Sequence, residues 1–395
     1  MFRGEFILFA LTLLGVALFH RQTMFIALGG LFSVLCFKWI TLSEFSLLHH
    51  LLGEWRVLVN LLGLLFGFAL LSKIFEESHL PKKLPHYLPA GVLGAFVLLV
   101  MIFIISSFLD NIAAAMIGGT IAFVVFRKKV HLGYLAAIIA ASNAGGAGSV
   151  VGDTTTTLMW IDGVDPLDVL HAFVASGSAL FIFGIIASYQ QHKFHPIAKD
   201  SLTHAKVDLG KISIVVMILA FTIITNWAFD FPALGVWGAI ILGSLYRKIP
   251  WYELKNAWQG TVFLMSLVLC ASLMPVETLP PASALSTFIL GFISAVFDNI
   301  PLTKLCLVQG GYDWGVLAYA VGFGGSMIWF GSSAGVALSN MFPEAKNTVA
   351  YIKASWHITV SYIIGFAVLM LTLGWNPHTP HKVNLLEKRS GPTTR

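Results

Sequence analysis

Three aspartates, Asp110, Asp153 and Asp298, lie deep inside long apolar stretches of the chain. A charged carboxylate in such a setting is unstable unless it faces a cavity, a cation or a partner, so each is a functional candidate. Burial favours the protonated form of the acid, whereas a bound cation favours the ionised form. Such a group can therefore exchange a proton for a cation. The alternatives are that these aspartates only cap broken helices or pair with Lys304.

The composition requires the apolar stretches to be membrane segments. Of the 395 residues, 57% are hydrophobic and 11% are charged, and the mean hydropathy is +0.83. Soluble proteins carry about 25% charged residues, so this chain has too few charges to cover a water-facing surface. We therefore expect an all-α polytopic membrane protein and no soluble enzyme. The net charge of +5 fits basic cytoplasmic loops rather than a nucleic-acid surface.

Apolar runs long enough to be candidate spans recur along the chain, and the first is interpreted as a retained membrane segment because no small-residue cleavage site follows it. The three cysteines lie singly within apolar runs, which supports neither a disulfide framework nor a metal site. The candidate spans are 5–19, 24–40, 55–73, 89–127, 132–160, 167–189, 210–229, 232–246, 260–276, 282–308, 314–340 and 352–374.

A polar segment near the middle divides the chain almost in half. We interpret it as a cytoplasmic linker between two similar units. The predicted organisation is N-terminal membrane segments (1–54), a first repeat (55–189), the polar linker (190–211), a second repeat (212–376) and a polar C-terminal tail (377–395).

Two motifs recur in the same order in both halves. The pattern Ser-x-x-x-Asp-Asn-Ile occurs at 106–112 and again at 294–300. A Gly-Gly pair followed five residues later by Gly-Asp-Thr or Gly-Ser-Ser occurs at 145–154 and at 324–333. Two ordered matches indicate an internal duplication.

The distribution of basic residues predicts that the second repeat is inverted. Lys82-Lys83 and Arg127–Lys129 flank the stretch that carries Asp110, whereas no Lys or Arg flanks the stretch that carries Asp298 within 277–281 and 310–313. Because basic loops are cytoplasmic, the first stretch would enter and leave from the same side as a re-entrant hairpin. Inverted repeats are typical of secondary transporters, with the binding site near the membrane midplane. The alternative is two ordinary crossings with a polar residue in each.

The glycine-rich segment 142–149 is predicted to unwind its helix, because four of its eight residues are small and flexible. Freed carbonyl oxygens, together with Asn143, Asp153 and the hydroxyls of 154–157, would offer an all-oxygen environment suited to a small cation. The segment 322–326 with Ser332-Ser333 supplies the inverted partner. Close helix packing through small residues is the alternative for the glycines.

Lys304 follows Asp298 by six residues, and Met116 occupies the equivalent place in the first repeat. We expect this lysine either to neutralise Asp298 or Asp153 when no cation is bound, or to extend toward the membrane interface.

The motifs at 143–147, 152–156, 298–302 and 324–336 closely resemble those of NhaD-type sodium/proton antiporters. That family belongs to the ion transporter superfamily, together with dicarboxylate, citrate and arsenite carriers. The resemblance implies an inverted-repeat fold with a scaffold and a transport domain, two re-entrant hairpins, two unwound transmembrane helices and a homodimer. The cation-binding positions carried over or expected are Ser106, Asp110, Asn111, Asn143, Gly145, Asp153, Thr154, Ser294, Asp298, Asn299, Gly325, Ser326 and Ser332.

The expected function is exchange of Na⁺ or Li⁺ for H⁺ by alternating access, with no cofactor, no enzymatic activity and no nucleic-acid partner. The expected location is multi-pass in a bacterial inner membrane. The alternative is Na⁺-coupled uptake of a di- or tricarboxylate, or arsenite transport, on the same fold. Three clustered carboxylates would repel an organic anion, which favours the first reading.

Overall fold

The computed structural model describes residues 4–379 except 20–21, 43–44, 199–205 and 277–278. Most of the expected C-terminal tail (377–395) and part of the expected linker (190–211) lie outside the described residues. The described part of this linker has no helix from 195 to 198 and from 206 to 208.

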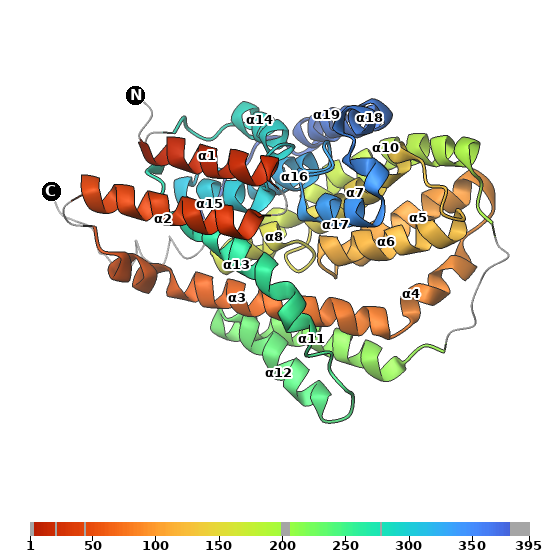
Figure 1. Ribbon diagram of the computed structural model, residues 1–395, viewed down its shortest axis with the longest axis horizontal. Helices are drawn as coiled ribbons and strands as arrows, with labels where there is room; N and C mark the ends of the chain where they lie inside the picture. Colours follow the sequence, from red (N-terminus) through yellow and green to blue (C-terminus); the bar gives the residue numbers. More distant parts are fainter. Residues whose placement is uncertain (1–3, 20–21, 43–44, 199–205, 277–278, 380–395) are drawn as a thin grey trace.

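The regular structure of the described residues is helical (Figure 1). The first half contains α1 (Gly4–Leu18), α2 (Thr23–Thr41), α3 (Leu47–Glu77), α4 (Leu80–Lys83), η1 (Leu84–Tyr87), α5 (Gly91–Ser106), α6 (Asn111–Val125), α7 (Leu132–Ala147), α8 (Thr154–Ile161), α9 (Pro166–Leu170) and α10 (Ala172–Phe194). The second half contains α11 (Leu209–Phe229), α12 (Pro232–Ser244), α13 (Glu253–Ser272), α14 (Ala284–Ser294), α15 (Asn299–Gln309), α16 (Trp314–Gly324), α17 (Ser333–Met341), η3 (Pro343–Lys346), α18 (Thr348–Ala354) and α19 (Trp356–Thr372).

Among the described residues, four helical segments are long and apolar enough to cross a membrane: α2, α3, the stretch 166–194 formed by α9 and α10, and α11. A fifth is formed by α18 and α19 together, which are bent by 56° at their junction. The chain is therefore a polytopic membrane protein, as its composition predicts. Several of the expected spans are nevertheless broken, because 89–127 contains both α5 and α6 and 132–160 contains both α7 and α8.

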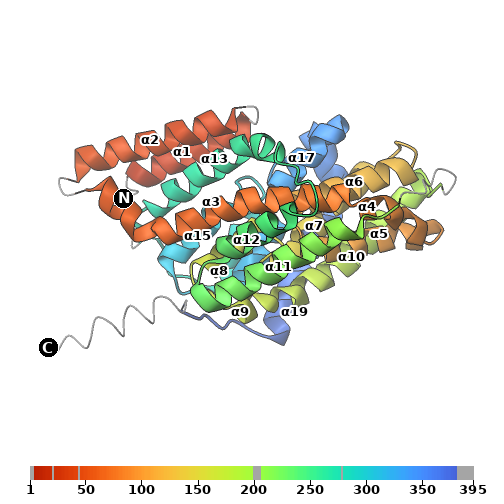
Figure 2. The ribbon, with the colours of Figure 1, turned by 90° about the horizontal axis from the view of Figure 1, so that it is seen from below.

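The helices pack in two groups. We call α1–α3 and α11–α13 the framework group, because α3 contacts α11, α12 and α13, and α13 also contacts α2. We call α5–α10 and α14–α19 the core group, within which α7 contacts α5, α6, α10 and α16. Figure 2 shows α3, α11 and α12 lying side by side along one face of the molecule. Contacts between the groups include α3 with α8 and α13 with α15.

The centre of the core group is formed by α7 and α16. Every residue of α7 from Gly133 to Ala147 is buried, as is every residue of α16. A helix that is apolar all round suits either a protein core or a membrane span, and the burial of these two helices shows that protein rather than lipid surrounds them. Both helices end at the glycine pairs of the repeated motif, so the motif lies at the middle of the molecule.

Candidate functional site

Asp110 and Asp298 occupy the same structural position in the two halves. Asp110 Oδ2 accepts a hydrogen bond from the backbone N–H of Ile112 at 3.1 Å, at the start of α6. Asp298 Oδ1 accepts one from the N–H of Ile300 at 3.0 Å, at the start of α15. A carboxylate there caps the helix and interacts favourably with its positive end. Helix capping, which the sequence offered as an alternative role for these aspartates, is thus one of their roles.

The loop before each of these helices is anchored to the central helix of its half by a serine. Ser106 Oγ donates to the carbonyl of Ser142 at 2.5 Å, and Ser294 Oγ donates to the carbonyl of Val321 at 2.6 Å. Ser142 and Val321 occupy equivalent positions, three residues before Gly145 and Gly324. The two motifs of each repeat therefore bind one another in the same way in both halves.

Glycines allow this close approach. A Cβ atom on Gly145 would overlap the carbonyl oxygen of Phe103 in α5, and one on Gly324 would overlap the carbonyl oxygen of Gly291 in α14. The expected unwinding over 142–149 begins later than predicted, because α7 stays helical to Ala147 and breaks only over 148–153. The first glycine of the pair allows close contact with the backbone of α5, and the break in the helix lies after the pair.

Hydroxyl groups hold the break between α7 and α8 together. Thr156 Oγ1 donates to the carbonyl of Ser149 at 2.6 Å, and Thr157 Oγ1 donates to the carbonyl of Val150 at 2.8 Å. Thr154 instead hydrogen-bonds with its side chain to Asp110. In the second half, Ser333 takes the place of Thr154 and donates to Asp298 Oδ2 at 3.3 Å.

A buried polar network joins the two halves at the centre. Asn111 Nδ2 donates to Asn143 Oδ1 and to Asp153 Oδ1, both at 3.1 Å. Asn143 Nδ2 donates to Ser326 Oγ at 2.9 Å and to Ser332 Oγ at 3.1 Å. All five side chains are at most 5% exposed. Asn143 thereby connects the first repeat to the break in the second.

Three buried polar atoms of the repeated motifs have no hydrogen-bond partner among the described residues: Asp153 Oδ2, Thr155 Oγ1 and Asn299 Nδ2. A Cβ atom on Gly322 would lie 3.7 Å from Asp153 Oδ2, so this oxygen faces α16. Asp110 and Asp298 both lie close enough to repel a charged Asp153. Buried polar atoms are almost always satisfied, so an unpartnered carboxylate oxygen near two other carboxylates indicates a place for a proton or a cation.

Lys304 does not pair with Asp298 or Asp153. Its ammonium group donates to Glu54 Oε2 at 2.9 Å and to Asp162 Oδ2 at 3.3 Å, and its side chain is 2% exposed. The expected pairing with Asp298 or Asp153 is therefore not found, and extension toward the membrane interface stays a prediction. The physical reason is distance along α15, since six residues of helix carry Lys304 about 9 Å beyond the capping aspartate and bring it to α3 and the end of α8.

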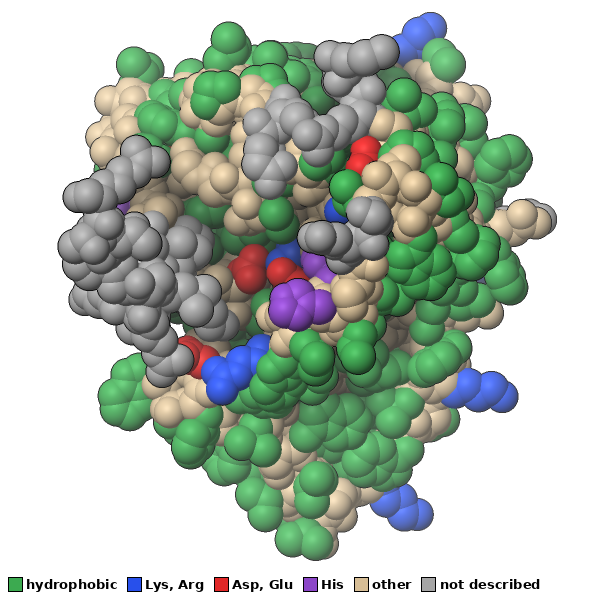
Figure 3. Space-filling model, turned by 90° about the vertical axis from the view of Figure 1, so that its left-hand side faces the viewer, with side chains coloured by type: hydrophobic (Ala, Val, Ile, Leu, Met, Phe, Trp, Pro, Cys, Tyr) green, Lys and Arg blue, Asp and Glu red, His purple; other side chains and the backbone are tan. Residues whose placement is uncertain are grey.

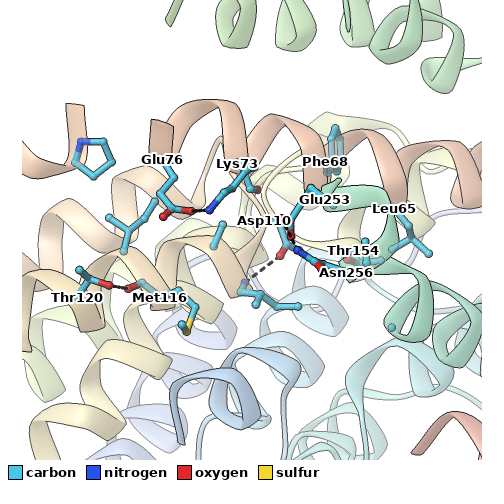
Figure 4. Close-up of a pocket in the computed structure, with 18 of the residues that line it drawn as sticks. Leu65, Phe68, Lys73, Glu76, Asp110, Met116, Thr120, Thr154, Glu253 and Asn256 are labelled. Atoms are coloured by element: carbon cyan, nitrogen blue, oxygen red, sulfur yellow. Dashed lines mark hydrogen bonds and ion pairs between the residues drawn. The ribbon is translucent and has the colours of Figure 1, made fainter. Parts of the chain in front are cut away.

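A cavity of about 730 Å³ lies between α3, α6, α8 and α13 and has Asp110 and Thr154 in its wall (Figure 4). Its walls are mostly apolar. Charged residues from α3, α4 and α13 also line it: Lys73, Glu76, Lys82 and Glu253. The cavity therefore leads from the end of the molecule that carries Lys82 to the carboxylate of Asp110.

The described residues contain no group of three or more His, Cys, Asp or Glu side chains suited to holding a metal ion. The donors that do converge are amide and hydroxyl groups with single carboxylates. Of the predicted positions, the central network unites Asn111, Asn143, Asp153, Ser326 and Ser332. Asp110 and Thr154 lie on the cavity wall, and Asp298 and Asn299 lie at the start of α15. The remaining predicted positions make backbone contacts around these residues: Ser106, Gly145, Ser294 and Gly325.

Sequence reasoning missed three residues of this region: Ser107, Glu54 and Asp162. Ser107 Oγ donates to the carbonyl of Gly145 at 2.9 Å. Ser333 was predicted together with Ser332, and its contact with Asp298 corresponds to that of Thr154 with Asp110. The partners of Lys304 are Glu54 and Asp162. Neither belongs to a repeated motif, so no sequence pattern pointed to them.

Comparison with known proteins decides the family. Residues 6–324 match the family model described as citrate transporter. The chain belongs to this family. It is therefore a membrane transporter and not an enzyme, and the expected place in the ion transporter superfamily is confirmed.

Its curated relatives include two from Arabidopsis thaliana, named sodium/proton antiporter 1 and sodium/proton antiporter 2. The first is 27% identical over 60% of this chain and 49% of its own length, and the second is 26% identical over 69% and 73%. The Na(+)/H(+) antiporter NhaD of Alkalimonas amylolytica is 25% identical over 67% of this chain and 66% of its own. The chain thus spans about half to three quarters of the length of these relatives.

Proposed function

We propose that this transporter exchanges Na⁺ or Li⁺ for H⁺, with Asp110, Asp153 and Asp298 binding cation and proton competitively. The observation that carries the proposal is the central network, in which Asn111 donates to one oxygen of Asp153 and is itself held by Asn143, while the other oxygen of Asp153 has no donor among the described residues. A carboxylate arranged in this way can accept either a proton or a hard cation. The relatives named sodium/proton antiporters support this choice of ions.

Charge supports the same conclusion. A charged Asp153 is repelled by Asp110 and by Asp298 unless protons or a cation neutralise these carboxylates. The buried lysine of the region is engaged elsewhere, with Glu54 and Asp162. Loss of protons from the cluster therefore favours entry of a cation, and entry of a cation favours loss of protons. This competition couples the two ions.

We further propose an inverted repeat in which α5–α6 and α14–α15 are re-entrant hairpins. Equivalent serine-to-carbonyl bonds, equivalent capping aspartates and equivalent glycine contacts in both halves support it. Basic residues mark cytoplasmic loops, so the cavity lined by Lys82 opens toward the cytoplasm. Helix α3 ends at Glu77, just before α4, which carries Lys82. We call this end of α3 the inner end, and the end that carries Glu54 the outer end.

Transport of a di- or tricarboxylate is the second candidate. The description of the family as citrate transporter and a cavity of about 730 Å³, large enough for such an anion, favour it. Against it, Asp110 lies in the cavity wall, and Lys73 is paired with Glu76 at 2.8 Å. The homodimer and the bacterial inner membrane stay predictions.

The test is Na⁺-induced proton movement in inverted vesicles from cells that lack their own antiporters. We expect addition of Na⁺ or Li⁺ to release protons in vesicles that contain the protein and not in vesicles without it. No response to either ion from mildly acidic to alkaline pH, combined with uptake of labelled citrate or succinate, would overturn the proposal in favour of the second candidate.

A further inference from the structure

The ion pairs of Lys304 connect the two groups of helices. Lys304 lies on α15 and Asp162 directly follows α8, both in the core group, whereas Glu54 lies on α3 in the framework group. The carboxylates are partly exposed, at 26% for Glu54 and 22% for Asp162, while the lysine is enclosed. Relative movement of the two groups must therefore separate Lys304 from Glu54.

This cluster lies at the opposite end of α3 from the mouth of the cavity. Glu54 and Glu76, which lines the cavity, are 22 residues apart in one helix, or about 33 Å. Figure 3 shows acidic, basic and histidine side chains gathered in a hollow at the end of the molecule where α3 begins. At this end α3 and α13 are also tied together, because His50 Nε2 and Ser272 Oγ lie 2.9 Å apart. The pathway is thus open at the inner end and closed by charges at the outer end.

The repeats show what the open form of this contact looks like. Lys304 is equivalent to Met116, counting from the capping aspartates, and Asp162 is equivalent to Met341, counting from the Gly-Asp and Gly-Ser pairs. Both methionines line the open inner cavity. If the two repeats exchange conformations, the protein opens at its outer end. Lys304 and Asp162 would then line an open outer cavity, as the two methionines line the inner one, and Lys304 would no longer contact Glu54.

We propose that Lys304, Glu54 and Asp162 form a charge lock that holds the outer pathway closed and must open in every transport cycle. The inference rests on the proposed alternating access between the two groups of helices, but not on the identity of the ion. The lock is one-sided, because Met116 and Met341 at the inner end cannot form an ion pair. Separation of a buried lysine from a carboxylate is unfavourable, so the lock biases the protein toward the state described here.

The lock is tested by the access of a thiol reagent from the outer side. Pro301 is equivalent to Ala113, which lines the inner cavity, yet Pro301 is buried. A Pro301→Cys reporter, in a protein whose three native cysteines are replaced by alanine, becomes accessible only when the outer pathway opens. Right-side-out vesicles are treated with a membrane-impermeant maleimide, and the rate of labelling is measured. That rate follows the population of the outward-open state.

We expect Glu54→Gln and Lys304→Met each to raise the labelling rate at least about fivefold, because each removes one partner of the lock and shifts the population toward the outward-open state. The matched control is Glu77→Gln on the same helix. Glu77 accepts from Lys211 at 2.5 Å and from Tyr252 at 2.8 Å, so it joins elements within the framework group only. Its replacement leaves the labelling rate unchanged.

A charge exchange gives the second test. Glu54→Lys combined with Lys304→Glu places a lysine opposite two carboxylates again, and we expect the labelling rate to return toward that of the starting protein. Unchanged labelling in both single variants, or equal acceleration by Glu77→Gln, would overturn the lock. If Lys304→Met fails to fold, Glu54→Gln decides alone, since Glu54 is partly exposed.

The outcome is separate from that of the proposed function. Labelling needs no ion exchange, so accelerated labelling without Na⁺-driven proton movement would support the lock and reject the antiport. Retained exchange with unaltered labelling would reject the lock and keep the antiport.

Discussion

Replacement of Asp153 by asparagine separates the role of a cation ligand from that of a structural acceptor. Asp153 Oδ1 accepts from Asn111 at 3.1 Å, and Oδ2 has no partner among the described residues. An asparagine carbonyl preserves the acceptor, so no hydrogen bond is lost. We expect the free energy of unfolding to change by less than about 1 kcal/mol.

The effect on cation binding is expected to be much larger. At an effective dielectric constant of about 20, two unit charges about 4 Å apart attract by about 4 kcal/mol. Loss of that attraction weakens binding of a monovalent cation by about a thousandfold, since each 1.4 kcal/mol is a factor of ten. Asp153→Asn should therefore lose Na⁺-driven proton movement at Na⁺ concentrations that saturate the unmodified protein.

The assay pairs proton movement in inverted vesicles with the melting temperature of the purified protein. Asp165→Asn is the matched control, because Asp165 also accepts a backbone hydrogen bond, from Leu167 at 2.8 Å, at the start of a helix remote from the network. We expect the control to retain both exchange and stability. Full exchange by Asp153→Asn would show that Asp153 is only a structural acceptor. A large fall in its melting temperature would show that the hydrogen-bond reasoning is wrong.

Two further substitutions test the architecture of the site. Gly145→Ala places a methyl group against the carbonyl of Phe103, and overpacking of this kind costs about 1–3 kcal/mol; an unchanged melting temperature would show that α5 can move away freely. Asn143→Ala removes three hydrogen bonds, worth about 1 kcal/mol each, and should lower both the melting temperature and the exchange rate. Retained stability would mean that the network does not hold the two halves together.

The helix breaks were predictable because polar residues in an apolar run have few stable positions. Within a membrane, an aspartate followed by asparagine is accommodated where a helix begins, and Asp110 and Asp298 both lie there. The detail at the glycine pair was not predictable in the same way. Flexibility suggested unwinding at Gly145, but α5 approaches so closely that the helix persists and the glycine serves as a contact surface.

The partners of Lys304 show where prediction from sequence ended. Glu54 and Asp162 are 250 and 142 residues away along the chain. Local spacing suggested the nearer Asp298, because an ion pair six residues apart is easy to propose. Helix geometry excludes it, since the lysine extends beyond the capping position toward another helix.

The amino-acid sequence alone determined that this is a polytopic membrane protein with duplicated motifs and three aspartates in its apolar interior. Those conclusions depend on composition and on spacing within single segments, where the cost of burying a charge is a local matter. The tertiary structure decided which carboxylate oxygen lacks a hydrogen-bond partner among the described residues, which asparagine bridges the halves and which carboxylates pair with Lys304. Each of these depends on contacts between helices far apart in the chain, and such contacts are set by packing rather than by local pattern.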